Sequence, residues 1–540
     1  MNAFRPAWLL ALAASIPPAS ALAHDDAARA SKDGKLGRVL FQTTCTPEAQ
    51  KQFERALAML HSFHFPETVK AFTAIPQTDP DCAIAYWGMA ISQRPNPLVG
   101  PWDAATLKRG LDLVQKGEAI GAKSQRERDW LAAIKVFYAD YETVDQDTRT
   151  RNYERAMDAL AKKYPDDVEA KVFDALALNE IFDHKSMDPL LKAIAILEPL
   201  DKKYPDHPGI THYLIHSYDF APIARKGLPA ADKYARIAPE APHAQHMPSH
   251  IYSMVGKWNE SIASNLRSVD VSNAYAAQNK MDGVLAGVPH SYDFMQYAYL
   301  QLGQDAKAKA LIDKSAEVKK VIGPVSAGNT ARAAVPARYM LERQDWKGAA
   351  ELTPLNTPFP PAEAITYFAR AMGKARSGDA AGAQADIDKM MALREGLLKA
   401  NQGYWAEQVE VQIIAARAWQ AQARGDSEEA FKLMAAAANL EDSTAKHVAM
   451  ENRLYPMREL FGDMLMIQGQ PGAALAAYEQ SMKAAPERLR GYYGAAKAAQ
   501  AMGDKATANA YFRKLAQLTR NADGARPELK EAKLRLAGGT

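Results

Sequence analysis

Histidines gather in one part of the sequence, and their spacing is suited to metal binding. The chain has 540 residues and 12 histidines, seven of which fall within residues 207–290. His212 and His216 form an i, i+4 pair, and so do His246 and His250. Residues four apart lie on one face of a helix, so each pair presents two imidazoles to one side. A histidine pair at this spacing is a familiar zinc-binding arrangement.

The two pairs also occupy equivalent places in a repeating pattern. His246 follows His212 by 34 residues, and His250 follows His216 by the same distance. Packed helices lie about 8–10 Å apart, and zinc–nitrogen bonds measure about 2.0–2.1 Å. Imidazoles on adjacent helices can therefore reach a common ion.

Two further histidines fit the same pattern. His243 lies three residues before His246 and extends that pair along one predicted helix face. His290 precedes Gly303 by 13 residues, which is also the spacing from His243 to Gly256. The predicted metal ligands are His212, His216, His243, His246, His250 and His290. The predicted residues that orient their rings are Tyr218, Asp219, Tyr252, Tyr292 and Asp293.

Three interpretations of these six histidines stay open at this point. The first is a transition-metal site of the zinc or copper type, with a metal-bound water as one route to catalysis. The second is a groove without metal that binds an acidic or aromatic ligand through hydrogen bonds. The third is structural packing, which is the ordinary role of a single helical histidine. Whether the six would form one metal site or two is also open.

The remaining histidines that bear on the argument are predicted to be structural. His61 closes a predicted helix near the start of the mature chain, and His184 and His207 fall in predicted turns. His447 lies in a predicted loop. The sequence contains no nucleophile elbow, HExxH, P-loop or dinucleotide-binding glycine motif. It therefore indicates no particular reaction.

The histidines belong to a chain of alanine-rich helical segments separated by short turns. From about Glu48, apolar residues recur at helical spacing and no alternating strand pattern appears. Turns of one kind recur, as at Gly256–Trp258 and Gly303–Asp305, and KKYPDD at 162–167 recurs as KKYPDH at 202–207. A 34-residue helix–turn–helix unit resembles the tetratricopeptide repeat. The predicted fold is all-α, an α-α superhelix whose concave groove carries the histidines and binds a protein or peptide partner.

Longer strings of sequence resemble one family. HPGITHYLIHSYD at 207–219 and PHAQHMPSHIYSMVGKW at 242–258 resemble a group of exported bacterial tetratricopeptide-repeat proteins. The sequence is similar to this group also at 56–65, 79–90 and 462–481. The resemblance implies the fold and the unusual histidines, and it implies no activity.

The N-terminus and the cysteines predict export. One positive charge, an apolar stretch and Ala21-Leu22-Ala23 form a signal-peptide pattern, which predicts a periplasmic or secreted protein. Cys45 and Cys82 are the two cysteines, and in an oxidising compartment they predict one disulfide. The predicted organisation is a signal peptide at 1–23, an extension at 24–46, a repeat array with the histidines at 47–310 and a continuous second array at 311–540.

Charge and hydropathy exclude two classes of partner. The 66 Lys and Arg against 63 Asp and Glu leave a net charge of +3, which is too small for a nucleic-acid binder that works by neutralising phosphates. After the signal peptide, no run of eighteen apolar residues occurs that would predict a membrane span. A transition metal and a protein or peptide partner remain the predicted ligands.

Overall fold

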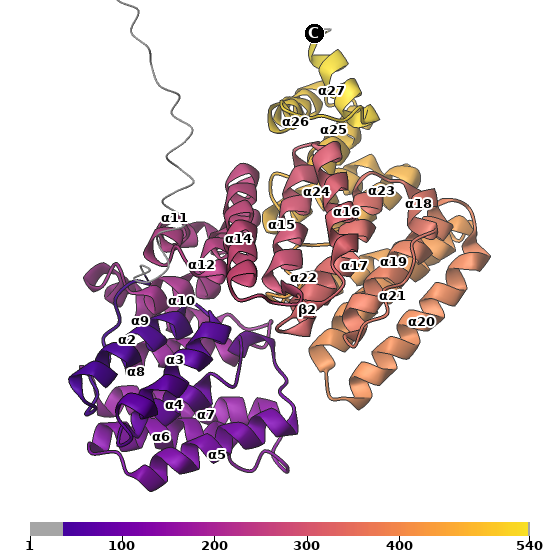
Figure 1. The fold of residues 1–540 in the computed structure, drawn as a ribbon. Coiled ribbons are helices and arrows are strands. Elements are labelled where there is room, and N and C mark those ends of the chain that lie inside the picture. Colours follow the sequence, from indigo (N-terminus) through magenta and orange to yellow (C-terminus); the bar gives the residue numbers. More distant parts are fainter. Residues whose placement is uncertain (1–35, 538–540) are drawn as a thin grey trace, which may run out of the picture. The chain divides into compact units, whose positions relative to one another are not determined.

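Helices make up nearly all the regular structure of this protein (Figure 1). The computed structural model describes residues 36–537. The predicted signal peptide at 1–23 and residues 24–35 of the predicted extension lie outside the described residues. Residues 36–537 belong to one compact unit, so the division predicted at 310/311 stays a prediction.

The elements of the first half are helical throughout. They are α2 (Pro47–His61), α3 (Phe65–Thr78), α4 (Ile84–Ile91), the 3₁₀ turn η1 (Pro97–Val99), α5 (Ala104–Ile120), α6 (Gln125–Tyr138), α7 (Gln146–Lys163), α8 (Val168–Glu180), α9 (Asp188–Lys203), α10 (Pro208–Tyr218), the 3₁₀ turn η2 (Ala224–Gly227), α11 (Leu228–Ile237), α12 (Pro242–His246), α13 (Pro248–Met254) and α14 (Trp258–Gln278).

The second half adds two very short strands to its helices. The elements are β1 (Val284–Leu285), α15 (Gly287–Gln301), α16 (Asp305–Glu317), β2 (Val321–Ile322), α17 (Val325–Glu342), α18 (Trp346–Ala350), α19 (Pro360–Arg376), α20 (Ala380–Lys399), α21 (Gly403–Ala423), α22 (Ser427–Asp442), α23 (Met457–Ile467), α24 (Pro471–Ala484), α25 (Leu489–Ala501), α26 (Lys505–Leu518) and α27 (Pro527–Ala537).

Consecutive helices pack against one another from one end of the chain to the other, as Figure 1 shows for α19, α20 and α21. The short turns between them use glycine where the backbone becomes left-handed. Gly256 has φ 75° and Gly303 has φ 68°, a conformation that glycine adopts without steric cost. A helix pair cannot bury its apolar stripe alone, so stacking completes the core. The prediction of an all-α, tetratricopeptide-like solenoid is confirmed.

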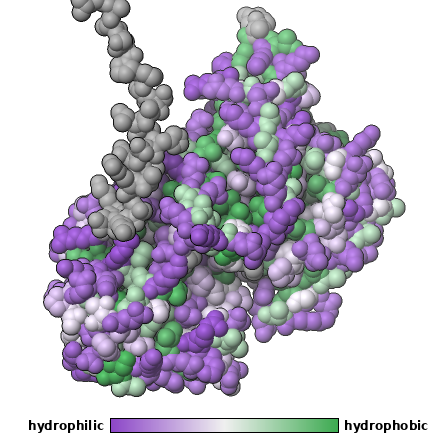
Figure 2. Space-filling model, in the orientation of Figure 1, coloured by the Kyte–Doolittle hydropathy of each residue, from purple (hydrophilic) through white to green (hydrophobic). Residues whose placement is uncertain are grey.

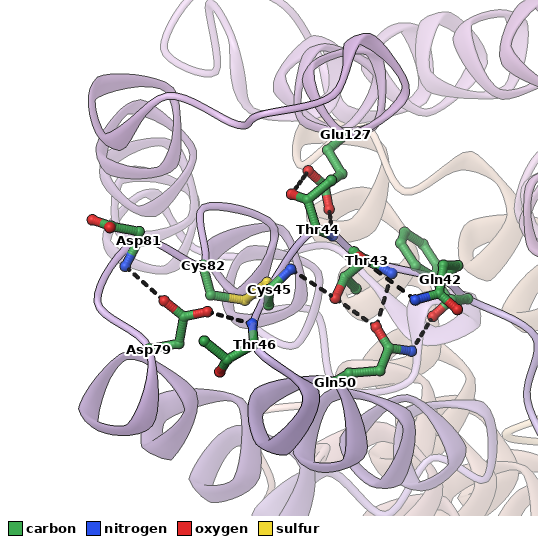
Figure 3. The surroundings of a disulfide bond; sticks show 11 residues. Gln42, Thr43, Thr44, Cys45, Thr46, Gln50, Asp79, Asp81, Cys82 and Glu127 are labelled. Carbon is green, nitrogen blue, oxygen red and sulfur yellow. Dashed lines mark hydrogen bonds between the residues drawn. A yellow bond between two sulfur atoms is a disulfide. The ribbon is translucent and has the colours of Figure 1, made fainter.

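The predicted disulfide is present at the N-terminal end of the described chain. Cys45 and Cys82 are bonded, with 5.0 Å between their Cα atoms, and the bond ties the segment before α2 to the turn before α4. Figure 3 shows the hydrogen bonds that hold the same segment, in which Thr46 N donates to Asp79 Oδ2 at 2.7 Å and Thr44 N donates to Glu127 Oε1 at 2.6 Å. This end of the fold is thus held by a covalent link and by buried polar contacts.

Two local features differ from the sequence prediction. His243, His246 and His250 were expected on one continuous helix, but the chain passes from α12 to α13 at Met247. Pro248 causes this break because it has no N–H to donate to the preceding turn. The second feature is a parallel pairing of β1 with β2, in which Val284 faces Val321. Strands of two residues leave no alternating pattern that sequence analysis can detect.

The face drawn in Figure 2 is mostly polar. Hydrophilic residues predominate on this face, and hydrophobic residues form scattered patches. Among the helices of residues 36–537, none combines the length and the apolar character needed to cross a membrane.

One buried carboxyl group makes stability depend on pH. Asp174 on α8 is 5% exposed, and burial, with Asp158 and Glu154 nearby, raises its pKa from 3.8 to about 7. The folded chain therefore holds a proton that the unfolded chain releases near pH 4, so stability falls as the pH rises from 4 to 7. We expect Asp174→Asn to raise the unfolding free energy at pH 8 by about 1–3 kcal/mol, and by less at pH 5. Urea denaturation at both pH values measures this.

The exposed Asp166 provides the control for that measurement. Asp166→Asn should leave the urea midpoint unchanged at both pH values, because an exposed carboxylate keeps its hydration in the folded chain. An Asp174→Asn variant that is no more stable than the wild type at pH 8 would contradict the assignment.

Candidate metal centre

The six predicted histidines come together in the fold as two adjacent groups of three. The first group is His212 and His216 from α10 with His243 from α12. Each ring offers one nitrogen, and the three nitrogens lie within 4.8 Å of one another. The ring of His212 is 4.8 Å from that of His216 and 5.0 Å from that of His243, measured between centroids. The group thus combines an i, i+4 pair on α10 with one residue from α12, and α11 (Leu228–Ile237) lies between these two helices in the sequence.

The second group is formed by His246, His250 and His290. They come from α12, α13 and α15, and their nearest ring nitrogens again lie within 4.8 Å of one another. The ring of His246 is 4.8 Å from that of His250 and 4.7 Å from that of His290. The ring of His250 also lies 6.0 Å from that of His216 in the first group. The two groups are therefore neighbours.

This grouping differs from the simplest expectation, in which the rings of both i, i+4 pairs surround one common metal position. His212 and His216 belong to the first group, whereas His246 and His250 belong to the second. The reason is that His243 faces α10, while His246 and His250 face α15. The rings also lie inside the protein rather than on an open groove surface, with His212 0% and His246 2% exposed.

In each group, two Nε2 atoms converge. His243 Nε2 lies 3.2 Å from His212 Nε2, and His246 Nε2 lies 2.9 Å from His250 Nε2. Two nitrogens bound to one tetrahedral ion at about 2.0–2.1 Å are themselves about 3.3 Å apart. The observed separations are close to that value, so the donor sets fit a metal ion with little movement.

In His212, His246 and His250 the nitrogen on the far side of the ring, Nδ1, faces an oxygen acceptor. His212 Nδ1 lies 2.6 Å from the backbone oxygen of His61, and His246 Nδ1 lies 2.6 Å from Asn265 Oδ1. The amide of Asn265 is fixed in this sense because its Nδ2 donates to the Ser261 carbonyl at 2.8 Å. An oxygen acceptor at Nδ1 places the proton there and leaves the lone pair on Nε2. Metal-binding histidines are commonly oriented in this way.

His250 has a different environment because two carboxylates face its Nδ1. Asp219 Oδ2 lies 2.8 Å away, and Glu451 contacts the same nitrogen. Burial lowers the pKa of His250, but the charges of Glu451 and Asp219 outweigh this effect and raise it to about 10. Burial and the nearby Asp219 also raise the pKa of Glu451 well above 4.5, so His250, Asp219 and Glu451 form one buried cluster that shares its protons.

The other five rings are neutral. Burial, reinforced by the neighbouring histidines, lowers the pKa of each well below 6.5. These rings are His212, His216, His243, His246 and His290. Neutral imidazole is the form that binds a metal ion, so five of the six ligands are ready at pH 7 without loss of a proton.

Two buried histidines have nitrogens without a hydrogen-bond partner among the described residues. His216 is 5% exposed and neither of its ring nitrogens is paired, and Nδ1 of His290 is unpaired at 8% exposure. A buried polar atom left unpaired costs about 1–3 kcal/mol. Coordination to a metal ion would give these nitrogens a partner.

Of the residues predicted to orient the rings, Asp219 does so through its bond to His250. The others bind elsewhere. Tyr218 donates to Glu198 at 2.5 Å, Tyr252 donates to Asp232 at 2.8 Å, and Asp293 pairs with Arg338. Within residues 36–537, neither these three residues nor Tyr292 forms a hydrogen bond to any of the six histidines. That part of the sequence prediction is wrong, because proximity in sequence did not reflect side-chain direction.

Sequence reasoning missed Asn265 and Glu451. Asn265 lies on α14, and Glu451 lies in the segment between α22 and α23, 201 residues beyond His250. Neither position carries a motif or a repeat spacing. Only the packing of distant segments brings them to the histidines.

The structural role predicted for His61 is supported by its contacts. Its Nδ1 bonds the Tyr213 hydroxyl at 3.0 Å and its Nε2 bonds Glu169 Oε2 at 2.9 Å. His207 Nε2 bonds the other oxygen of Glu169 at 2.9 Å, and its Nδ1 accepts from Ile210 N at the start of α10. Every ring nitrogen of this pair is satisfied within the protein. The pair thus contrasts with His216.

A cavity of about 510 Å³ adjoins both histidine groups. His216 and His243 line it from the first group, and all three members of the second group line it as well. His212 lies behind them, outside the lining. A small molecule in this cavity would therefore contact both groups.

No protein-family model and no curated protein matches this sequence. A structure of Naa15/Naa10 bound to HypK-THB aligns over 91% of this chain and 91% of the matched chain, at 12% identity and a TM-score of 0.24. The crystal structure of the APC/C hetero-tetramer Cut9–Hcn1 aligns over 90% and 96%, at 11% identity and a TM-score of 0.29. Similarity at this level carries no argument about function, and the exported bacterial family stays a prediction.

Proposed function

We propose that this protein is an exported metal-binding protein that holds two transition-metal ions, of the zinc or copper type, side by side. His212, His216 and His243 would hold one ion, and His246, His250 and His290 would hold the other. Three imidazoles per ion leave coordination positions for water or a substrate, as in catalytic zinc sites. A bound zinc ion would supply Lewis acidity, and a bound copper ion would supply electron transfer.

The observation that carries this proposal is the convergence of Nε2 atoms in both groups. The converging nitrogens are 3.2 and 2.9 Å apart, and the far sides of His212, His246 and His250 are held by oxygen acceptors, so both sets support metal binding. The unpaired nitrogens of His216 add support, because packing alone gives them no partner. Imidazole favours zinc and copper over magnesium or calcium, which take oxygen ligands.

Export is part of the proposal for a separate reason. The disulfide between Cys45 and Cys82 is typical of an oxidising compartment. The signal-peptide pattern at 1–23 agrees with this. A periplasmic or secreted location would also expose the chain to metal ions outside the reducing cytosol.

The test is metal content. Chains purified without a histidine tag, stripped with chelator and dialysed against zinc or copper, should contain two ions per chain by plasma mass spectrometry. A variant with both His216→Ala and His290→Ala should contain none, at unchanged helical content. If the wild type retains no metal, the alternative of a metal-free protein- or peptide-binding scaffold takes the place of this proposal.

Asn265 allows a finer test of the second site. It holds His246 in position through Nδ1. We expect Asn265→Ala to weaken metal binding at the second group about 10- to 100-fold, the usual effect of losing such an orienting group. Competition with a chromophoric chelator measures the affinity.

Ser264 is the matched control for Asn265. It is buried on the same helix, but its hydroxyl bonds the backbone oxygen of Gln245 rather than a histidine. Ser264→Ala should leave both metal affinities unchanged. Equal weakening by the two variants would show that helix α14, rather than the Asn265 contact, is responsible.

A further inference from the structure

The cavity beside the histidines has the size and shape of a site for a small organic molecule. Its volume of about 510 Å³ lies within the range of roughly 300–1,000 Å³ that is usual for such sites. Segments distant in sequence meet around it, including the 3₁₀ turn η1, both short strands and helices α12 to α15. The β1–β2 pairing thus has a function in the fold, because Leu285 and Ile322 form part of the wall.

The walls of the cavity are mainly apolar and include several aromatic rings. The apolar and aromatic residues of the wall include Phe63, Phe65, Val99, Trp102, Leu285 and Ile322. Phe63 also stacks on His243, with 5.3 Å between ring centroids and 22° between planes. Aromatic walls favour aromatic ligands through stacked and edge-to-face contacts.

A few polar atoms interrupt this apolar lining. Ser272 on α14 lines the cavity at 1% exposure, and its hydroxyl has no hydrogen-bond partner among residues 36–537. His216 and His290, which also carry unpaired ring nitrogens, line the same cavity. A ligand with a hydrogen-bonding group could pair with these atoms, which an unsubstituted hydrocarbon could not.

The cavity offers little to balance a charge on a ligand. Two lining residues can carry a positive charge, and both are already engaged. Arg109 is exposed and donates to Thr106 Oγ1 at 2.8 Å, and His250 is paired with Asp219 and Glu451. An exposed charge is screened by solvent and contributes little binding energy. The apolar wall instead penalises the burial of an ionised group.

From this lining we propose that the cavity binds a small, uncharged aromatic molecule with a hydroxyl group, held against the two histidine groups. Binding of this molecule requires only the cavity. That the molecule is also a substrate rests on the proposed metal function. The hydroxyl faces Ser272, and the aromatic ring lies against Phe63 and Trp102.

Gly287 provides a variant that obstructs the cavity. It is the first residue of α15, it lines the cavity, and a Cβ placed there would meet no atom within 4 Å. Phenylalanine at this position should cover the mouth without disturbing the helix. Gly403 is the matched control, because it is the first residue of α21, its Cβ would also meet nothing within 4 Å, and it lies outside the cavity lining.

The experiment is a fluorescence titration of the full chain with 2-naphthol, in metal-free and metal-loaded protein. We expect saturable binding in both forms. In the metal-free chain, naphthalene-2-sulfonate should bind at least tenfold more weakly than 2-naphthol, because its charge must be buried. Gly287→Phe should weaken 2-naphthol binding at least tenfold, and Gly403→Phe should leave it unchanged. Ser272→Ala, which removes only the hydroxyl, should weaken it roughly three- to tenfold.

The outcomes separate this proposal from the metal proposal. Metal bound at two ions per chain without 2-naphthol binding overturns the cavity proposal alone. Binding of 2-naphthol by a chain that takes up no metal overturns the proposed function and leaves a ligand site. Tighter binding of the sulfonate than of 2-naphthol to the metal-free chain, or equal binding of 2-naphthol by Gly287→Phe and wild type at equal helical content, overturns the cavity proposal as well.

Discussion

Replacement of His216 by alanine is expected to lower metal affinity at the first group by roughly 100- to 1,000-fold and to leave the second group occupied. Structural zinc sites with four ligands have apparent binding energies of about 10–16 kcal/mol, so one ligand contributes on the order of 3–4 kcal/mol. His216 is the member of the first group with both nitrogens unpaired, so its loss removes a ligand and breaks no hydrogen bond. Competition against a chromophoric chelator would resolve the two affinities.

The reciprocal variant makes this prediction specific. His290→Ala should weaken the second group and spare the first, because its ring belongs to the second set of nitrogens. His184→Ala, which removes a histidine outside both groups, should change neither affinity. If His216→Ala and His290→Ala each abolish both bound ions, then the six histidines form one shared site instead of two.

Local periodicity explains how much of this centre could be predicted from the sequence. His212 and His216 share a helix face, and the 34-residue repeat carries that geometry to His246 and His250. Both facts depend only on helix geometry and on repeat stacking, which act over short distances. The same reasoning predicted the stacked helices and, with the redox compartment, the Cys45–Cys82 bond.

The division of the histidines into two groups could not be predicted in that way. It depends on which neighbour each ring faces, because His243 and His246 lie on the same short helix α12 and still belong to different groups. Glu451 reaches His250 from a segment 201 residues away, and nothing in its local sequence indicates this. Contacts of this kind are set by the stacking of many helices, each of which adds a small rotation.

Arg488 is expected to contribute more to stability than any other side chain considered, since its replacement by methionine should cost about 3–5 kcal/mol. It is 0% exposed at the start of α25, and its guanidinium donates to Glu459 Oε1 at 2.7 Å and to Glu342 Oε1 at 2.7 Å. A third bond goes to the Tyr297 hydroxyl at 2.9 Å. Arg488→Met would leave two carboxylates buried without a counter-charge. Chemical denaturation followed by circular dichroism measures the loss.

The cost arises from the carboxylates left behind, and a compensated variant tests this reasoning. Combining Arg488→Met with Glu342→Gln and Glu459→Gln removes all three buried charges, so it should restore most of the lost stability. If the combined variant is no more stable than Arg488→Met, packing of the long arginine side chain is the main contribution.

Loss of the Arg488 contacts should also leave the metal affinities nearly unchanged in chains that remain folded. Arg488 bonds α15, α17 and α23 through Tyr297, Glu342 and Glu459, whereas its hydrogen bonds do not include any of the six histidines.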